Sequence, residues 1–234
     1  MAGMTPEQLQ AFPLYKSLSL EQCAQLLDRH LETSHAAEQL IVMQQDWGES
    51  LFLLRQGMAK VRSFTIDGDE VVLALLGQGD TFGEMAAFEG TSRSADVVAL
   101  TPLTVVKMRA RAFRDLLHQQ AGFAIALAQL EAARLREMNR RFLLQRADAT
   151  IRLLDALAYL ACCSSPQRDP RAPIPALAQR EVGVLAGLAR ETASRALSKL
   201  RHRGTVDDRD GQLRIVDLQP LIQRGLLPPA DRPA

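Results

Sequence analysis

The sequence predicts an α+β protein with an N-terminal jelly roll of short strands, a long central helix and a C-terminal winged helix-turn-helix. Between residues 40 and 108, glycines separate short apolar runs at roughly ten-residue spacing, a pattern typical of a sandwich or barrel. After Met108 glycine becomes rare, and a long stretch rich in Ala, Leu, Arg and Glu favours helix. Near the C-terminus the apolar pattern predicts a helix, a tight turn, a second helix and a short hairpin.

The composition limits where the protein acts and what it binds. The 234 residues carry a net charge of +1, so a surface that binds nucleic acid must be local. Cys23, Cys162 and Cys163 form no even set, which favours a reducing compartment over a disulfide framework. The sequence contains neither a signal-peptide pattern nor a run of about 18 apolar residues. We therefore expect a cytoplasmic protein without a membrane partner.

The N-terminal region is expected to hold two helices followed by the roll. Helices are predicted over residues 5–12 and 19–31, and the second opens with Ser19 and Gln22 at capping-box spacing. A jelly roll of about eight strands is the natural closure of the glycine-punctuated region. The best strands are Ser50–Leu54, Ala59–Phe64, Glu70–Leu76, Ser94–Ala99 and Thr104–Met108.

The central helix carries an apolar seam that suggests a partner. Only Gly122 interrupts the helical pattern from Ala110 to Arg146. A helix with a near-seven-residue apolar repeat usually packs on another helix, which favours a parallel homodimer; a buried helix within one domain is the alternative. The seam residues are Ala128, Leu135, Met138 and Phe142. The predicted domains are an effector-sensing roll over residues 1–120, a dimerisation helix over 121–147 and a DNA-binding domain over 148–234.

The C-terminal domain is predicted to present one helix to DNA. A helix over 148–163 and a Pro- and Arg-rich loop over 164–175 precede a helix from Ala176 to Ala186, a turn over 187–189 and a helix from Arg190 to Arg203. Strands around Val206 and over 213–216 would form the wing. On a helical wheel the last helix has one apolar face and one polar face. Its apolar face comprises Ala193, Ala196, Leu197 and Leu200.

The polar face suits the major groove of double-stranded DNA. Arg190 and Arg195 can each bind guanine O6 and N7 with two hydrogen bonds, and Glu191 can accept from cytosine N4. Lys199, Arg201 and His202 are better placed for phosphates. The alternative is an ordinary solvated helix face with charge pairs, but the preceding apolar helix and the Gly187 turn favour a DNA reader.

The run from Arg180 to Leu197 closely resembles the helix-turn-helix of the cAMP receptor protein/FNR (CRP-FNR) family of bacterial transcription regulators. The resemblance implies a homodimer on promoter DNA that reads a palindrome of TGTGA-like half-sites, about 34 Å apart for a two-fold dimer. Contact of the 164–175 loop with RNA polymerase follows only by analogy. The candidate DNA-binding residues are Arg180, Arg190, Glu191, Ser194, Arg195 and Lys199.

A second motif, Gly79–Phe88 followed by Thr91–Ala95, is similar to the phosphate-binding cassette of the same family. A glycine turn before a short helix offers backbone N–H groups to an anion, and Arg93 can clamp a phosphate. Glu84 can accept from a ribose hydroxyl, and Ser94 can add a donor. Alternatively, Glu84 and Arg93 pair with each other and support the roll without a ligand.

The resemblance also implies that a Thr-Ser pair on the central helix contacts the base, and this chain departs from that pattern. The aligned positions are Met138-Asn139 or Leu135-Arg136, which lack hydroxyls. We expect Asn139 or Arg136 to substitute, and we expect the effector to be cAMP or a cyclic dinucleotide such as cyclic di-GMP. The candidate ligand-binding residues are Gly83, Glu84, Met85, Ala86, Arg93, Ser94, Arg136 and Asn139.

Other chemistries fit the sequence less well. An iron–sulfur sensor needs several N-terminal cysteines, whereas Cys23 stands alone before the roll. Isolated histidines argue against haem. A cupin-type enzyme needs several histidines inside its barrel, and none lies between His35 and His118. Cys162 and Cys163 read as inert buried thiols rather than a redox pair. We expect no metal and no catalytic activity, and keep a ligand-independent regulator as the alternative.

Overall fold

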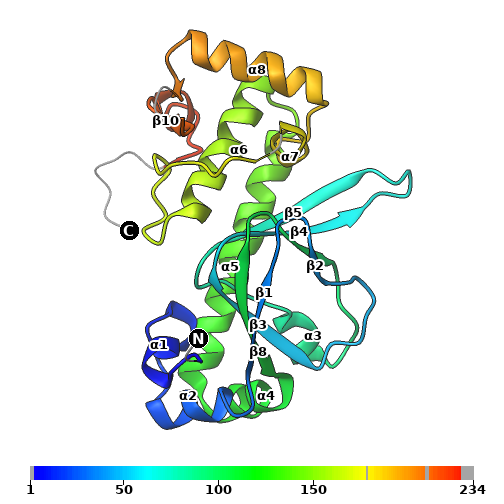
Figure 1. Cartoon of the computed structure of the whole chain (residues 1–234), viewed down its shortest axis with the longest axis vertical. Coiled ribbons are helices and arrows are strands. Elements are labelled where there is room, and N and C mark those ends of the chain that lie inside the picture. Colours follow the sequence, from blue (N-terminus) through cyan, green and yellow to red (C-terminus); the bar gives the residue numbers. More distant parts are fainter. Residues whose placement is uncertain (1–2, 178, 209–210, 228–234) are drawn as a thin grey trace. The chain divides into compact units, whose positions relative to one another are not determined.

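The computed structural model describes residues 3–177, 179–208 and 211–227 (Figure 1). Contacts divide the chain into two compact units. The first comprises Met1–Ser63 and Leu76–Glu137, and the second comprises Phe64–Leu75 and Met138–Ala234. This division passes through both a hairpin and the long helix, so the predicted domain boundaries after residues 120 and 147 stay predictions.

The N-terminal helices are shorter than the sequence pattern suggests. Helix α1 (Pro6–Gln10), the 3-10 turn η1 (Pro13–Tyr15) and helix α2 (Leu20–Leu26) form, and capping boxes open α1 and α2. The prediction that the second helix continues to Leu31 is wrong. Arg29 adopts a left-handed backbone conformation, with φ of 54°, which cannot continue a right-handed helix. The chain instead enters strand β1 (Leu31–His35).

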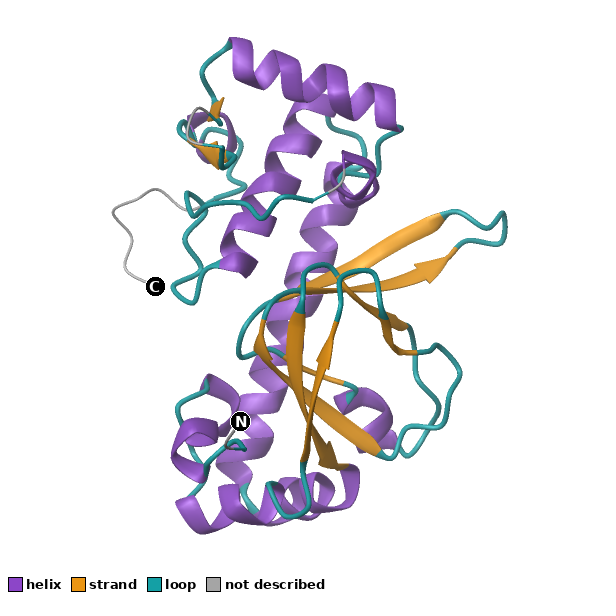
Figure 2. Ribbon diagram, in the orientation of Figure 1, coloured by secondary structure: helices purple, strands orange, loops and turns teal. Residues whose placement is uncertain are grey.

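The roll consists of two four-stranded sheets, as the jelly-roll prediction requires (Figure 2). Their strand orders are β1-β8-β3-β6 and β2-β7-β4-β5, and the register places Leu53 opposite Val106. All five predicted strands are present, and β4 and β5 have the predicted bounds. The remaining strands of the roll are β2 (Leu40–Val42), β3 (Ser50–Gln56), β4 (Ala59–Phe64), β5 (Glu70–Leu76), β6 (Thr81–Phe82), β7 (Asp96–Ala99) and β8 (Leu103–Arg109).

Two apolar clusters hold the first unit together. In one, α1, α2 and helix α4 (Ala110–Gln119) gather around the start of α5, where the Phe113 and Phe123 rings meet edge to face at 5.5 Å between centroids (Figure 1). In the other, Phe52 stacks on Phe82 between the two sheets at 5.0 Å. Because aromatic rings bury large apolar areas, the first cluster fixes the roll against the first turns of α5 and the second holds the roll itself together.

The long helix α5 (Ala121–Leu144) leaves the predicted seam exposed. Its break from α4 falls at Gln120, which has extended backbone angles, rather than at Gly122. Phe123 is the buried side chain of α5, so the alternative of a helix buried within one domain is wrong. Of the predicted seam residues, Leu135, Met138 and Phe142 are 53%, 48% and 68% exposed, and Ala128 is also exposed. An apolar face of this kind is typical of a helix that packs on a partner.

The second unit contains the predicted winged helix-turn-helix. Asp148 caps helix α6 (Ala149–Ser164), and helices α7 (Gln179–Leu185) and α8 (Arg190–His202) follow. The predicted start of α7 at Ala176 is too early, because Ile174 is held extended by pairing with Leu213; Ala178 lies outside the described residues. The remaining elements are β9 (Val206–Asp207), β10 (Arg214–Ile215) and α9 (Gln219–Ile222). None of the described helices is both long and apolar enough to cross a membrane.

Candidate effector site and nucleic-acid interface

The predicted cassette forms a glycine turn that leads into helix α3 (Glu84–Glu89). Gly83 begins the turn in the left-handed region, with φ of 79°. A Cβ at Gly83 would lie 2.4 Å from Nη1 of Arg93, so both the backbone angle and the space require glycine. Glycine at position 83 is therefore required for Arg93 to pack against this turn.

Arg93 is buried beneath this turn. Its Nη1 donates to the carbonyl of Gly83 at 3.0 Å and its Nη2 to the carbonyl of Ser50 at 2.6 Å. Its guanidinium also lies 5.6 Å from the ring centroid of Phe52. Burial lowers the pKa of Arg93 from its ordinary value. An anion that reached this guanidinium would meet a cation held in place by the glycine turn and by strand β3.

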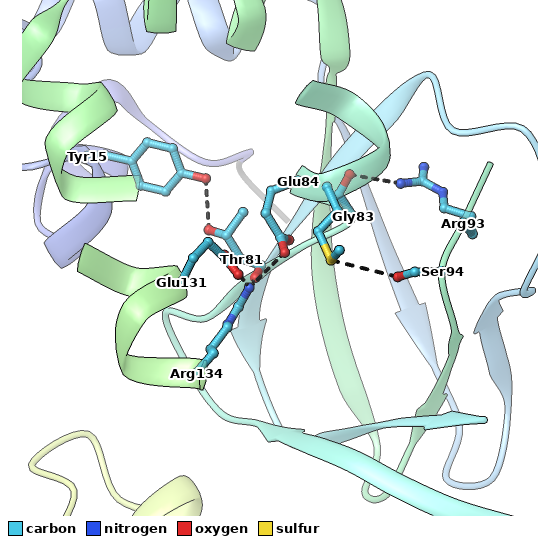
Figure 3. A network of polar contacts seen from close by, with 9 residues as sticks. Tyr15, Thr81, Gly83, Glu84, Arg93, Ser94, Glu131 and Arg134 are labelled. Atoms are coloured by element: carbon cyan, nitrogen blue, oxygen red, sulfur yellow. Dashed lines mark hydrogen bonds and ion pairs between the residues drawn. The ribbon is translucent and has the colours of Figure 1, made fainter. Parts of the chain in front are cut away.

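Glu84 pairs with Arg134 of α5, so the alternative in which Glu84 and Arg93 pair with each other is wrong. Arg134 Nη1 donates to Glu84 Oε1 at 2.8 Å and to Glu131 Oε1 at 3.0 Å (Figure 3). Its Nη2 donates to the carbonyl of Thr81, whose hydroxyl hydrogen-bonds to the buried Tyr15 hydroxyl at 2.9 Å. This network joins α5, the cassette and the N-terminal helices.

The environment of Glu84 opposes its charge. Burial raises the pKa of Glu84, and the positive charge of Arg134 counteracts only part of that rise. Its Oε2 is buried and has no hydrogen-bond partner among the described residues. Because an unsatisfied buried carboxylate oxygen is costly, Oε2 is an acceptor available to a ligand hydroxyl.

The other predicted ligand residues divide into two groups. Met85 is 48% exposed, Ala86 is buried, and the Ser94 hydroxyl donates to the Met85 sulfur at 3.8 Å (Figure 3). Arg136 is exposed on α5, and no hydrogen bond or ion pair joins it to the cassette in the part of the chain that the structure describes. Asn139 is also exposed and belongs to the second unit.

Sequence reasoning missed Arg134. Helix α5 contains four arginines, and their types and spacing do not reveal which one reaches the cassette. The available signal was weak: Arg134 lies three residues after Glu131, at ion-pair spacing. Only the folded roll brings Glu84, fifty residues away in the chain, to that arginine.

On α8 the predicted reading face is exposed and the predicted apolar face is buried. Ala193, Ala196 and Leu200 are buried and Leu197 is half-buried, which confirms the packing face. Four of the predicted DNA-binding side chains line one surface depression; they are Arg190, Glu191, Ser194 and Arg195. The remaining two, Arg180 on α7 and Lys199, are also exposed.

The wing restrains one further cation of α8. Arg201, which the wheel placed among the phosphate-facing residues, pairs with Asp208 after β9 at 2.6 Å. Both side chains are largely exposed, so solvent screens the pair and its stabilising effect is small. Arg201 is consequently a weaker candidate for a phosphate contact than Lys199.

Comparison with known proteins assigns both halves of the chain. The cyclic nucleotide-binding domain matches residues 32–120, and the Crp-like helix-turn-helix domain matches residues 140–224. The cyclic AMP receptor protein of Thermus thermophilus is 31% identical over 195 residues, which cover 83% of this chain and 88% of that protein. The cAMP-activated global transcriptional regulator CRP of Pasteurella multocida is 32% identical over 154 residues, covering 65% and 74%.

Solved structures share the fold. FixK2 from Bradyrhizobium japonicum has a TM-score of 0.70 and 22% identity, with 86% of this chain and 98% of that chain covered. The c-di-GMP responsive global regulator CLP of Xanthomonas campestris has a TM-score of 0.66 and 20% identity, covering 85% and 100%. The matched family regulates transcription and is not a family of enzymes, which excludes the cupin-type alternative. The two domain matches and the Thermus relative together show that the chain belongs to the CRP-FNR family of bacterial transcription regulators.

Proposed function

We propose that this regulator is a homodimer that reads a palindromic promoter sequence and changes its DNA affinity when a cyclic nucleotide binds the cassette. The observation that carries the proposal is the exposed face of α8, on which Arg190, Glu191, Ser194 and Arg195 surround one depression. Two arginines flanking a carboxylate can read adjacent G·C pairs in the major groove. Lys199 and Arg180 would contact phosphates beside a TGTGA-like half-site.

The effector side of the proposal rests on Arg93 and Glu84. The carbonyls of Gly83 and Ser50 occupy two of the five N–H donors of Arg93, so donors remain for a phosphodiester. Glu84 Oε2 would accept from a ribose hydroxyl. The binding site for the anion would be lined by Gly83, Met85, Ala86 and Ser94, and Arg136 or Asn139 would lie near the base of the nucleotide.

The class of the effector is a cyclic nucleotide, with cAMP and cyclic di-GMP as the two candidates. The relative from Thermus thermophilus is named for cyclic AMP, and the Xanthomonas protein of similar fold is named for its response to c-di-GMP. Effector binding would shift a population between two DNA-binding states, which requires different affinities for them. A 100-fold change in DNA affinity needs about 2.7 kcal/mol of coupling.

The homodimer would form along α5. Its exposed Ala128, Leu135 and Phe142 lie seven residues apart, and a second copy in parallel would cover them. The two recognition helices would then face successive major grooves. We expect the protein to act in the cytoplasm, where double-stranded promoter DNA would be its partner, and contact with RNA polymerase rests on family analogy.

Titration calorimetry with cAMP, cGMP and cyclic di-GMP tests the effector, and binding to a TGTGA palindrome tests the DNA reader. Each is measured on the wild-type protein, on Arg93→Ala and on Arg190→Ala. We expect Arg93→Ala to lose the effector, and we expect Arg190→Ala to keep the effector while its preference for the operator sequence is relaxed. DNA binding without any effector response would favour the ligand-independent regulator. Absence of sequence-specific DNA binding would refute the proposal.

A further inference from the structure

One face of α6 carries polar side chains that reach three different elements of the second unit. Arg152, Asp155 and Tyr159 recur at intervals of three and four residues and therefore lie on the same side of the helix. None of them belongs to the reading face of α8 or to the cassette. Their contacts connect the helix-turn-helix turn, the end of α5 and the hairpin that contains β5.

Arg152 binds the turn between α7 and α8. Its Nε donates to the carbonyl of Ala186 at 3.1 Å, and its Nη2 donates to the carbonyl of Gly187. These carbonyls follow directly after α7, whose last carbonyls lack partners within the helix. The planar guanidinium of Arg152 gives the carbonyls of Ala186 and Gly187 their hydrogen-bond donors and fixes the direction in which these carbonyls point.

Gly187 makes the same turn intolerant of a side chain. Its φ is +61°, and a Cβ there would lie 2.6 Å from Nη2 of Arg152. The turn therefore has the left-handed conformation that glycine favours and packs closely against the guanidinium. Because α8 begins at Arg190, three residues after Gly187, the position of this turn sets where the reading face starts.

The other two residues tie α6 to α5 and to an edge strand. Asp155 is buried and pairs with Arg140 of α5. The Tyr159 hydroxyl accepts from the Leu75 N–H at 3.1 Å and donates to the Leu75 carbonyl at 3.3 Å. Since β5 is an edge strand of its sheet, one side of it has no neighbouring strand, and this hydroxyl provides hydrogen bonds there.

Arg141 strengthens the attachment of the hairpin. Its two terminal nitrogens donate to the carbonyls of Val72 at 2.9 Å and Leu73 at 3.1 Å, and its guanidinium lies 5.6 Å from the centroid of the Tyr159 ring. The hairpin, the end of α5 and the α7–α8 turn are thus all bound to one face of α6. A displacement of either of the first two would be passed to α6 and to the turn.

We propose that Arg152 is a positioning residue for DNA recognition, which sets the direction of α8 by holding the carbonyls of Ala186 and Gly187. The inference rests on the proposed DNA-binding function. Base-specific contacts need accurate placement of α8, whereas attraction to phosphates tolerates misplacement. Loss of the guanidinium should therefore weaken binding to the operator more than binding to unrelated DNA.

The test uses the full-length protein and an operator that the wild-type protein selects from a random duplex pool. Affinities for this operator and for an unrelated duplex are measured by fluorescence anisotropy at several salt concentrations. The variants are Arg152→Met, Arg152→Lys and, as a control for lost charge, Arg146→Met, which removes an exposed arginine of the same unit. Circular dichroism melting checks that each variant is folded.

We expect Arg152→Met to weaken operator binding on the order of ten-fold, because a misplaced α8 makes poorer base contacts, with non-specific affinity and salt dependence unchanged. Arg152→Lys should recover part of the loss, because its ammonium can still donate to one carbonyl. If Arg152→Met does not fold, the intermediate affinity of Arg152→Lys carries the test.

Three results would overturn the inference. Operator affinity could be unchanged in both Arg152 variants, which would show that the carbonyl contacts do not position α8. Operator and non-specific affinity could instead fall together with a smaller salt dependence, which would make Arg152 a phosphate contact. Failure of the wild-type protein to select any operator would refute the proposed function itself. This outcome is distinguishable from failure of the inference about Arg152, because the selection with the wild-type protein comes before any variant is measured.

Discussion

Arg134 of α5 and Glu84 of the cassette form an ion pair with an N–O distance of 2.8 Å, although fifty residues separate them in the chain. The Glu84 side chain is 8% exposed and the Arg134 side chain 24% exposed, so solvent screens the pair weakly. The same helix carries the exposed seam. A ligand hydroxyl that binds Glu84 would consequently act on a residue already attached to the proposed dimer helix.

Arg134→Met should destabilise the first unit by about 3 kcal/mol, because it leaves the Glu84 carboxylate buried without its partner. Chemical denaturation followed by circular dichroism measures the change. Arg136→Met, which alters an exposed arginine two residues away, should stay within about 0.5 kcal/mol. The double variant Arg134→Met/Glu84→Gln should lose less stability than the sum of the losses in the two single variants. Additive losses would show that the pair is not coupled.

Glu84→Gln should change how stability depends on pH. Since burial raises the pKa of Glu84 above its ordinary value of 4.5, the folded protein favours the protonated carboxyl. The stability that this group contributes is full below pH 4.5 and is lost as pH rises through the higher pKa of the folded state. As the pH rises from 4 to 7, the free energy of unfolding of the wild type should therefore fall relative to that of Glu84→Gln.

Thermal melting of both proteins across that pH range provides the measurement. All other titrating groups are shared, so they cancel in the difference between the two proteins. A difference that is flat with pH, or that shifts in favour of the wild type as pH rises, would contradict the raised pKa.

The strands and the recognition helix could be predicted because local signals define them. Glycines at 57, 68 and 77 bracket β4 and β5, and the helical wheel of α8 separates its buried and exposed faces correctly. The second N-terminal helix ends before Leu31 because Arg29 takes a left-handed conformation, which the residue types alone do not reveal. Arginine is a good helix former, so its identity gave no warning.

The partners of the predicted site residues could not be predicted, because they are set by the fold. Glu84 and Arg93 were both identified, yet each is held by groups from distant strands or helices rather than by the other. Arg152 likewise reaches Ala186, 34 residues later in the chain. Charge spacing along a helix reports neighbours at three and four residues and carries no information on such long-range contacts.

A charge placed on the seam of α5 should separate the proposed homodimer. Leu135→Glu would bury a carboxylate opposite its own copy, whereas Ala133→Glu places the same charge on an exposed position outside the seam. Sedimentation velocity should show a monomer for Leu135→Glu at concentrations where Ala133→Glu and the wild type are dimers. A dimer that survives Leu135→Glu would place the subunit interface elsewhere.

The reading face of α8 can be separated from its phosphate-binding part by two substitutions. Arg190→Ala removes the proposed bidentate contact with guanine, so it should cost about 1–3 kcal/mol on the operator and relax preference at one base pair. Lys199→Ala removes a proposed phosphate contact, so it should weaken all sequences alike and reduce the salt slope by about 1.

Both variants are compared on the selected operator, on operators with single base changes and on unrelated DNA over a range of salt concentrations. Both side chains are exposed, so differences in folding should be small. If Arg190→Ala and Lys199→Ala give the same pattern, Arg190 does not read a base. The depression formed with Glu191, Ser194 and Arg195 would then be a phosphate-facing surface, and sequence preference would have to arise from DNA shape.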